Sequence, residues 1–159
     1  MIFVATGTTG FDGLVEGMDH LALSLDEPVV MQIGNGRYVP RHAGYFRFVS
    51  SLDPYYERAS LVVGHGGMGT CLEVLAHGKP FVALANPDRY DQHQQDIVRI
   101  LAEKNHLIWC QGLAELPEAV ERARNHEFKR YVSPDCHIHL VIVEFLRKNG
   151  RPRRDEGST

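Results

Sequence analysis

The residues best suited to chemistry lie in a glycine-rich stretch between Leu61 and Glu73. The apolar run at its start predicts a buried strand, and helical spacing resumes from Thr70. Four glycines between them allow a turn to bring its backbone close to a ligand: Gly64, Gly66, Gly67 and Gly69. A helix that begins on such a turn points free N–H groups, and the positive end of its dipole, at whatever lies there. The stretch therefore predicts a seat for a phosphate group.

Three side chains accompany this loop at fixed offsets. Thr70 can add a hydroxyl to the phosphate seat, and His65 is expected at its rim. Glu73 follows Thr70 at a spacing that puts both on one face of the helix. Its carboxylate is then expected one turn beyond the phosphates, where it suits the paired hydroxyls of a ribose. The alternative interpretation is a close-packed turn followed by a solvated glutamate.

Two other kinds of anion-binding loop share features with this stretch. A P-loop requires G-x-x-x-x-G-K-[ST], and no lysine follows Gly69. Gly64 to Gly69 does satisfy the dinucleotide fingerprint G-x-G-x-x-G, and Asp88 lies about twenty residues further on. That fingerprint belongs after the first strand of a domain, whereas this copy follows a strand deep in the chain. An NAD-dependent enzyme is therefore kept as an alternative function.

Short apolar runs alternate with amphipathic segments along the chain, and this alternation predicts the fold. The predicted strands are residues 1–5, 29–33, 45–49, 61–63, 81–85 and 107–110. The predicted helices are residues 11–25, a short one capped by Asp53 with Pro54 at its first position, 70–76, 91–101, 113–124 and 134–148. We expect an α/β fold with a single Rossmann-like, doubly wound parallel sheet over residues 1–149. Residues 150–159 lack apolar anchors and are expected to form a flexible charged tail.

Four loops of this predicted sheet meet at one edge. In such sheets, ligands bind outside the carboxyl ends of the strands. The loops that fall there are residues 6–10, 48–51, 64–70 and 86–95. Within the last of them, Asp91 to Gln94 supplies carboxylate, amide and imidazole groups side by side, which suits the hydroxyls of a sugar. The alternative is an ordinary polar first helical turn with Asp91 as its N-cap.

The composition limits the class of protein. With 159 residues and 43% hydrophobic content, the chain is expected to form one domain with a sizeable core. A net charge of -3 argues against a nucleic acid as partner. The three cysteines, Cys71, Cys110 and Cys136, lack C-x-x-C spacing and predict buried thiols in a reducing compartment, with no metal site. Because no apolar run is long enough to span a membrane, we expect a soluble, cytoplasmic protein.

Taken together, the motifs resemble the donor site of GT-B glycosyltransferases. The run His65-x-Gly67-x-x-Thr70-x-x-Glu73 is followed by Gly78-x-Pro80 and then by Asp91-Gln92. The resemblance is closer to the C-terminal domain of glycosyltransferase family 28. It implies that the fold is equivalent to the C-terminal half of a GT-B enzyme.

Within that family the chain looks most like the short, free-standing forms. These are the catalytic subunit of the eukaryotic dolichol-linked GlcNAc transferase and the bacterial exopolysaccharide glycosyltransferase subunits. They share G-T-x-x-F-D-x-L-V, here Gly7 to Val15, and D-x-H-Q, here Asp91 to Gln94. The resemblance extends from Met1 to about Leu113. The eukaryotic forms often carry aspartate at the position of Glu73, so this residue favours the bacterial forms.

The resemblance implies a role for each matching position in binding a UDP-sugar. The loop and first helical turn would hold the diphosphate, Glu73 the ribose, and the backbone around Phe48 and Val49 the uracil. The first loop would close the site, and the Asp91 to Gln94 run would face the donor sugar. The implied donor-binding residues are Gly7, Thr8, Thr9, Phe48, Val49, His65, Gly66, Gly67, Met68, Gly69, Thr70, Glu73, Asp91, Gln92, His93 and Gln94.

The resemblance also implies an inverting sugar transfer that needs no metal or other cofactor. Asp12 and His93 are the candidates in this chain for the general base that deprotonates the acceptor, and a partner could equally supply it. The implied process is polysaccharide or glycoconjugate biosynthesis. An alternative role is a non-catalytic nucleotide-sugar-binding activator subunit.

One domain leaves no room for the acceptor half of a GT-B enzyme. We therefore expect a separate, membrane-associated acceptor-binding subunit and a lipid-linked acceptor. This partner would hold the chain at the inner face of the membrane. The rim that it covers would favour self-association of the isolated chain.

Overall fold

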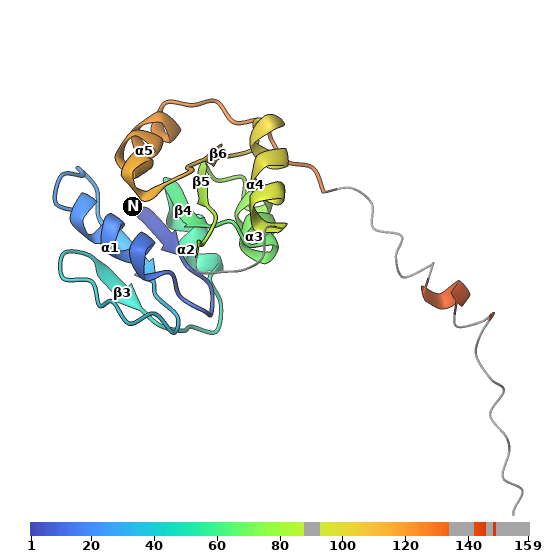
Figure 1. The fold of residues 1–159 in the computed structure, drawn as a ribbon, viewed down its shortest axis with the longest axis horizontal. Helices are drawn as coiled ribbons and strands as arrows, with labels where there is room; N and C mark the ends of the chain where they lie inside the picture. The colour runs from blue at the N-terminus through green and yellow to red at the C-terminus, as the bar shows by residue number, and fades with distance from the viewer. Residues whose placement is uncertain (88–92, 134–141, 146–147, 149–159) are drawn as a thin grey trace, which may run out of the picture.

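A computed structural model of the chain describes residues 1–87, 93–133, 142–145 and 148. Six parallel strands form one sheet: β1 (Ile2–Ala5), β2 (Val29–Gln32), β3 (Gly44–Phe46), β4 (Leu61–His65), β5 (Phe81–Leu84) and β6 (Ile108–Trp109). Their order is β3-β2-β1-β4-β5-β6 (Figure 1). This is the Rossmann order, which reverses direction between β1 and β4. The predicted doubly wound parallel sheet is confirmed.

Helices cover both faces of the sheet (Figure 1). α1 (Asp12–Leu21) and α5 (Leu116–Arg124) pack on one face, against side chains such as Ile2 and Val4. α2 (Asp53–Arg58), α3 (Met68–Ala76) and α4 (His93–Glu103) pack on the other face, around Phe3 and Val62. Because successive residues of a strand point to opposite faces, a continuous apolar run fills both cores. In the described part of the chain, no helix is long and apolar enough to cross a membrane.

Several predicted boundaries were wrong. The third strand was expected to reach Val49 but ends at Phe46, where the guanidinium of Arg47 donates to the carbonyls of Gly34 (3.0 Å) and Gly36 (2.8 Å). These bonds draw the chain away from the edge of the sheet. The first helix ends at Leu21 instead of residue 25.

The starts of three helices also differ from the prediction. The N-cap of α2 is Leu52, so Asp53 and Pro54 both lie inside its first turn. α3 begins at Met68, two positions earlier than expected from the sequence. A short 3-10 turn, η1 (Leu113–Glu115), precedes α5, which starts one residue before Pro117. Pro is accepted in the first turn of a helix because the N–H it lacks would have no partner there.

The predicted closing helix is only partly described. Residues 142–145 are helical, and Ile142 (51% exposed) and Phe145 (63%) are largely exposed. Residues 134–141 of the predicted helix lie outside the described residues. The predicted tail at 150–159 also lies outside them.

A buried carboxylate holds the irregular segment between β2 and β3. Asp19 is fully buried on α1. Its oxygens accept hydrogen bonds from the backbone N–H groups of Arg41 (2.9 Å), His42 (2.8 Å) and Ala43 (3.1 Å), and from the hydroxyl of Tyr38 (3.0 Å). Burial by itself would raise the pKa of Asp19, but these hydrogen bonds outweigh it and lower the pKa below its usual value. Asp19 therefore anchors the segment as a charged group.

Replacing Asp19 with asparagine should lower the free energy of unfolding by about 1–3 kcal/mol at neutral pH, because the new amide N–H₂ would face backbone N–H donors. The folded-state pKa lies below the unfolded one, so this stabilisation is complete above about pH 4 and is lost as the pH falls through the folded pKa. The deficit of Asp19→Asn should thus shrink in acid. Chemical denaturation at neutral pH and at about pH 3.5 measures it. Glu16→Gln, an exposed position on α1, is the control, and equal stability of Asp19→Asn and wild type at neutral pH would contradict the anchoring role.

Candidate functional site

The glycine-rich turn joins β4 to α3 at the carboxyl edge of the sheet. It is tighter than expected, because β4 continues to His65 and only Gly66 and Gly67 separate it from the helix. A Cβ atom at Gly66 would overlap Cγ2 of Val98 on α4. Gly66 is therefore required by packing, which supports the close-packed interpretation for that position.

The start of α3 has no negative charge of its own to balance the helix dipole. Its N-cap is Gly67, which offers no side chain to the free N–H groups of the first turn. The first turn of α3 carries no acidic residue, whereas the other described α-helices have one there: Asp12, Asp53, Asp96 and Glu118. The positive end of the α3 dipole is thus left unneutralised by its own helix.

Gly69 faces open space in this first turn. A Cβ atom there would meet nothing within 4 Å, and Gly69 lines the cleft described below. Glycine inside a helix costs about 1 kcal/mol relative to alanine, and packing gives no reason for it at this position. Room for a ligand beside the backbone is a physical reason for glycine here.

His65 connects the loops that follow β4 and β1. Its Nδ1 lies 3.3 Å from Oγ1 of Thr70. Its ring packs so closely on the backbone of Gly67 and Gly7 that a Cβ at Gly7 would lie 2.8 Å from Cε1. Gly7 has a φ of +70°, a left-handed conformation that favours glycine. His65 therefore lies beside the start of α3, and its ring sets the distance between the two loops.

Glu73 lies one turn along α3 from Thr70 and is oriented by a tyrosine. The hydroxyl of Tyr56 donates to Oε2 of Glu73 over 3.2 Å, while the Tyr56 ring is buried between Phe3 and His77. Burial and the negative charge of Glu73 raise the pKa of Tyr56, so its hydroxyl stays protonated and available as a donor. The exposed Glu73 carboxylate is thus held in one orientation, unlike a freely solvated residue.

These elements surround a cleft of about 420 Å³. Eight of the predicted donor-site residues line it: Gly7, Thr8, Thr9, His65, Gly69, Thr70, Glu73 and Gln94. They come from the ends of β1 and β4 and from the starts of α3 and α4, so three of the four predicted loops meet at the cleft. No residue of the fourth loop, 48–51, lines it. Asn86 links these loops through two hydrogen bonds. Its backbone N–H donates to Oε1 of Gln94 (3.4 Å), and its Nδ2 donates to the carbonyl of Gly10 (3.4 Å).

Three lining residues were not among the predicted ones: Gln32, Leu52 and Asn86. Gln32 ends β2, and every strand of a parallel sheet ends at the same edge, so its position in the sequence was an available signal. Leu52 carries no such signal, because its place depends on how α2 packs beside α3.

Other predicted residues lie outside the cleft. Phe48 (55% exposed), Val49 (44%) and Met68 (50%) present apolar surface at the ends of β3 and β4, and Gly66 and Gly67 serve the turn itself. Asp91, Gln92 and the side chain of His93 lie outside the described residues, as does Asp88 of the dinucleotide alternative. Their proposed contacts with a donor sugar stay predictions.

Asp12, a candidate base, lies beside a smaller neighbouring hollow. That hollow of about 240 Å³ shares Thr9 and Asn86 with the main cleft. Oδ1 of Asp12 accepts hydrogen bonds from the backbone N–H groups of Arg37 (2.8 Å) and Tyr38 (3.2 Å). One Asp12 oxygen therefore has a structural role.

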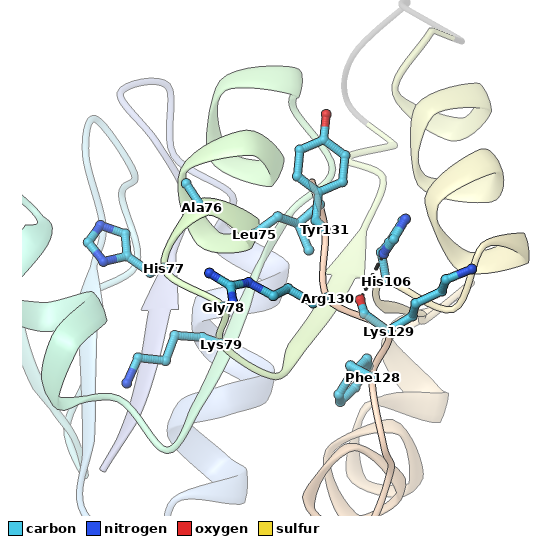
Figure 2. A pocket seen from close by; sticks show the side chains of 10 residues that line it. All are labelled: Leu75, Ala76, His77, Gly78, Lys79, His106, Phe128, Lys129, Arg130 and Tyr131. Atoms are coloured by element: carbon cyan, nitrogen blue, oxygen red, sulfur yellow. Dashed lines mark hydrogen bonds between the residues drawn. The ribbon is translucent and has the colours of Figure 1, made fainter. Parts of the chain in front are cut away.

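A second hollow of about 420 Å³ lies at the opposite end of α3 (Figure 2). Its lining includes Lys79, Lys129 and Arg130 but no predicted donor-site residue. Figure 2 shows the guanidinium of Arg130 beside Gly78, just past the end of α3, where a cation complements the negative end of the helix dipole. Because it is at the amino edge of the sheet, this hollow is not where a Rossmann fold binds nucleotides.

Cysteine chemistry and metal binding have little support in the described residues. They contain no group of three or more His, Cys, Asp or Glu side chains placed to hold a metal ion. Cys71 and Cys110 are free and buried, and burial raises the pKa of Cys71 to about 12 and also raises that of Cys110. Both thiols are therefore protonated and unreactive at neutral pH.

Solved structures confirm the fold. The crystal structure of Acinetobacter baumannii MurG aligns with a TM-score of 0.66 at 20% identity, over 92% of this chain and 49% of that one. The NMR solution structure of ALG13 aligns with a TM-score of 0.62 at 19% identity, over 92% of this chain and 96% of that one. The sheet is thus equivalent to one half of a two-domain GT-B enzyme.

Sequence comparison identifies the family. The human UDP-N-acetylglucosamine transferase subunit ALG13 is 31% identical over 122 residues, which cover 69% of this chain and 11% of the relative. The protein of the same name from Yarrowia lipolytica is 36% identical over 101 residues, covering 62% of this chain and 52% of the relative. The chain thus spans only about a tenth of the human relative. The model of the glycosyltransferase family 28 C-terminal domain matches residues 1–138, and the chain belongs to that family.

Proposed function

We propose that this chain is the donor-binding and catalytic subunit of a two-component, inverting glycosyltransferase. It would move a sugar from a UDP-sugar to a lipid-linked acceptor in polysaccharide or glycoconjugate biosynthesis. Family membership and relatives named as UDP-N-acetylglucosamine transferase subunits support this function over an NAD-dependent enzyme. UDP-N-acetylglucosamine, the sugar nucleotide in those names, is the first donor to test.

The observation that carries the proposal is the uncapped start of α3 in the cleft. Free N–H groups, an unneutralised helix dipole and the open space at Gly69 suit a diphosphate. Glu73, held by Tyr56, lies one turn further on, where ribose hydroxyls would follow. The cleft therefore has a place for the phosphates and an acceptor for the ribose, in the order that they occur in UDP.

Catalysis would use the same N–H groups. Charge builds on the diphosphate as the bond to the sugar breaks, and preorganised N–H donors stabilise it without a metal ion. A base must also take the proton of the acceptor hydroxyl. His93 and Asp12 are the candidates in this chain, and the partner subunit is the other source.

The acceptor would come from a membrane-associated partner subunit. Phe48, Val49 and Met68 expose apolar side chains at the loops that end β3 and β4, near the cleft. Such a surface is typical of a protein interface. The partner would keep the chain on the cytoplasmic face of the membrane, and without it the same surface would favour self-association.

UDP should bind this chain alone, and EDTA should not weaken the binding. The reason is that the proposed seat consists of backbone N–H groups and hydroxyls, with no acidic pair of the kind that holds Mg²⁺. Calorimetry in EDTA and in Mg²⁺ measures the difference. Binding that requires a divalent ion would contradict this form of the site.

Gly69→Ala and Gly66→Ala should have opposite effects. At Gly69 the added methyl enters open space in the cleft, so stability should stay the same or rise by up to about 1 kcal/mol. UDP should nevertheless bind at least about tenfold more weakly, because the methyl occupies the diphosphate seat. At Gly66 the methyl overlaps Val98, and stability should fall by about 1–3 kcal/mol.

Thermal melting and UDP titration of both variants check this pair. If Gly69→Ala binds UDP as tightly as wild type, the anion does not sit at the start of α3.

Sugar transfer should require the partner. The chain alone should show little turnover, because inverting attack needs the acceptor held opposite the diphosphate in a site closed to water. In the reconstituted pair, Glu73→Ala in this chain should lower kcat/KM by about 10- to 150-fold, the equivalent of a lost charged hydrogen bond of about 1.5–3 kcal/mol. Glu16→Ala, the same change at an exposed glutamate of α1, is the matched control. Normal turnover by the Glu73→Ala pair would favour the activator role instead.

A further inference from the structure

One polar atom in the cleft lacks the hydrogen bond that its burial demands. Gln32 is only 6% exposed, lines the cleft, and its Oε1 has no hydrogen-bond partner. Buried side-chain oxygens are nearly always paired, because leaving one unpaired is costly. Among the described residues, the other buried unpaired atom is Nε of Arg124, whose guanidinium is already bound to Asp26 and Glu27. Oε1 of Gln32 has no such ion pair to offset the cost of its burial.

The side chain of Gln32 points to the face of the sheet that α3 covers. Its neighbours Met31 and Ile33 pack into the core beneath α1 and α5, so the side chain of Gln32 points to the opposite face. In the sheet, Gln32 pairs with Ala5, and Ala5 pairs with Gly64. Because Gly64 has no side chain, Thr70 of α3 lies close to its backbone. Gln32 on β2 and the face of α3 that carries Thr70 and Glu73 line the same cleft.

The chemistry of the ligand decides which group can meet this acceptor. Both phosphates of a UDP-sugar are esterified and fully ionised at neutral pH, so they offer only acceptors and cannot satisfy an amide oxygen. The nucleoside of UDP does carry donors, namely the N–H of the base and the two ribose hydroxyls. On α3, the seat for the diphosphate lies in the first turn, and Glu73, one turn further on, lies on the nucleoside side of it.

We infer that Oε1 of Gln32 accepts a hydrogen bond from the nucleoside part of the donor. This inference rests on the proposed function, since it takes UDP as the ligand. Gln32 then approaches the nucleoside from β2 while Glu73 approaches it from α3. Without ligand, the unpaired oxygen costs free energy, and a hydrogen bond from the ligand removes that cost. The oxygen therefore selects ligands that have a hydrogen-bond donor at that point.

The test is Gln32→Met, which keeps the length of the side chain and removes its polar atoms. The melting temperature without ligand should be no lower than that of wild type, because an unpaired buried acceptor has been removed. UDP should bind about two- to tenfold more weakly, as expected for one lost neutral hydrogen bond. The factor should be the same for UDP-N-acetylglucosamine, because the lost contact is with the nucleoside. Gln111→Met, the same change at an exposed position beyond β6, is the control.

The possible failures are distinct. If wild type does not bind UDP, the proposed function itself is wrong. If wild type and Gln32→Met bind UDP equally, or if the loss appears only with the UDP-sugar, Gln32 does not contact the nucleoside.

A second measurement uses the unaltered protein, in case the variant folds poorly. The side-chain amide resonances of Gln32 in a ¹H–¹⁵N spectrum should shift on addition of UDP and not on addition of inorganic pyrophosphate. Unchanged resonances at saturating UDP, or an equal shift with pyrophosphate, would overturn the inference.

Discussion

The site depends on the parallel pairing of β1 with β4, at the point where the strand order reverses. From there, α1 leaves toward one face of the sheet and α3 toward the other, so the loops that precede them part and leave a crevice. The last pair in register is Ala5 with Gly64, and because Gly64 has no side chain, Thr70 of α3 lies close to its backbone. The ring of His65 lies between the two loops, against Gly7 and Gly67, and sets their separation. A shift of one residue in this pairing would turn these side chains to the other face.

The electrostatics of α3 differ from those of the other described helices. Its first turn has no acidic residue, and it contains a glycine that packing does not require. Each of these features makes the empty helix start less stable than it could be. Natural proteins break local rules in this way mostly at functional sites, where a ligand supplies the missing interaction. The unpaired Oε1 of Gln32 in the same cleft follows the same logic.

Two other buried polar side chains, those of Asp19 and Tyr56, have hydrogen-bond partners and stabilise the fold. Asp19 receives four hydrogen bonds and holds the segment that leads into β3. Tyr56 uses its hydroxyl to orient Glu73. The bond from Tyr56 therefore places one acceptor of the cleft on a rigid support, as the binding of a small ligand requires.

The sequence alone determined the fold class and most of the cleft. Alternating apolar runs gave the parallel sheet, and the glycine-rich turn with Thr70 and Glu73 located the start of α3, because these signals are local in the chain. The roles of Leu52 and Tyr56 were decided only by tertiary structure. They come from the start of α2 and from α2 itself, and nothing local to them indicates that they meet α3. The end of β2 marked the edge of the sheet where Gln32 lies, but only the tertiary structure buries its Oε1 without a partner in the cleft. Only the strand order brings them together, and that order is set by pairings between residues far apart in the sequence.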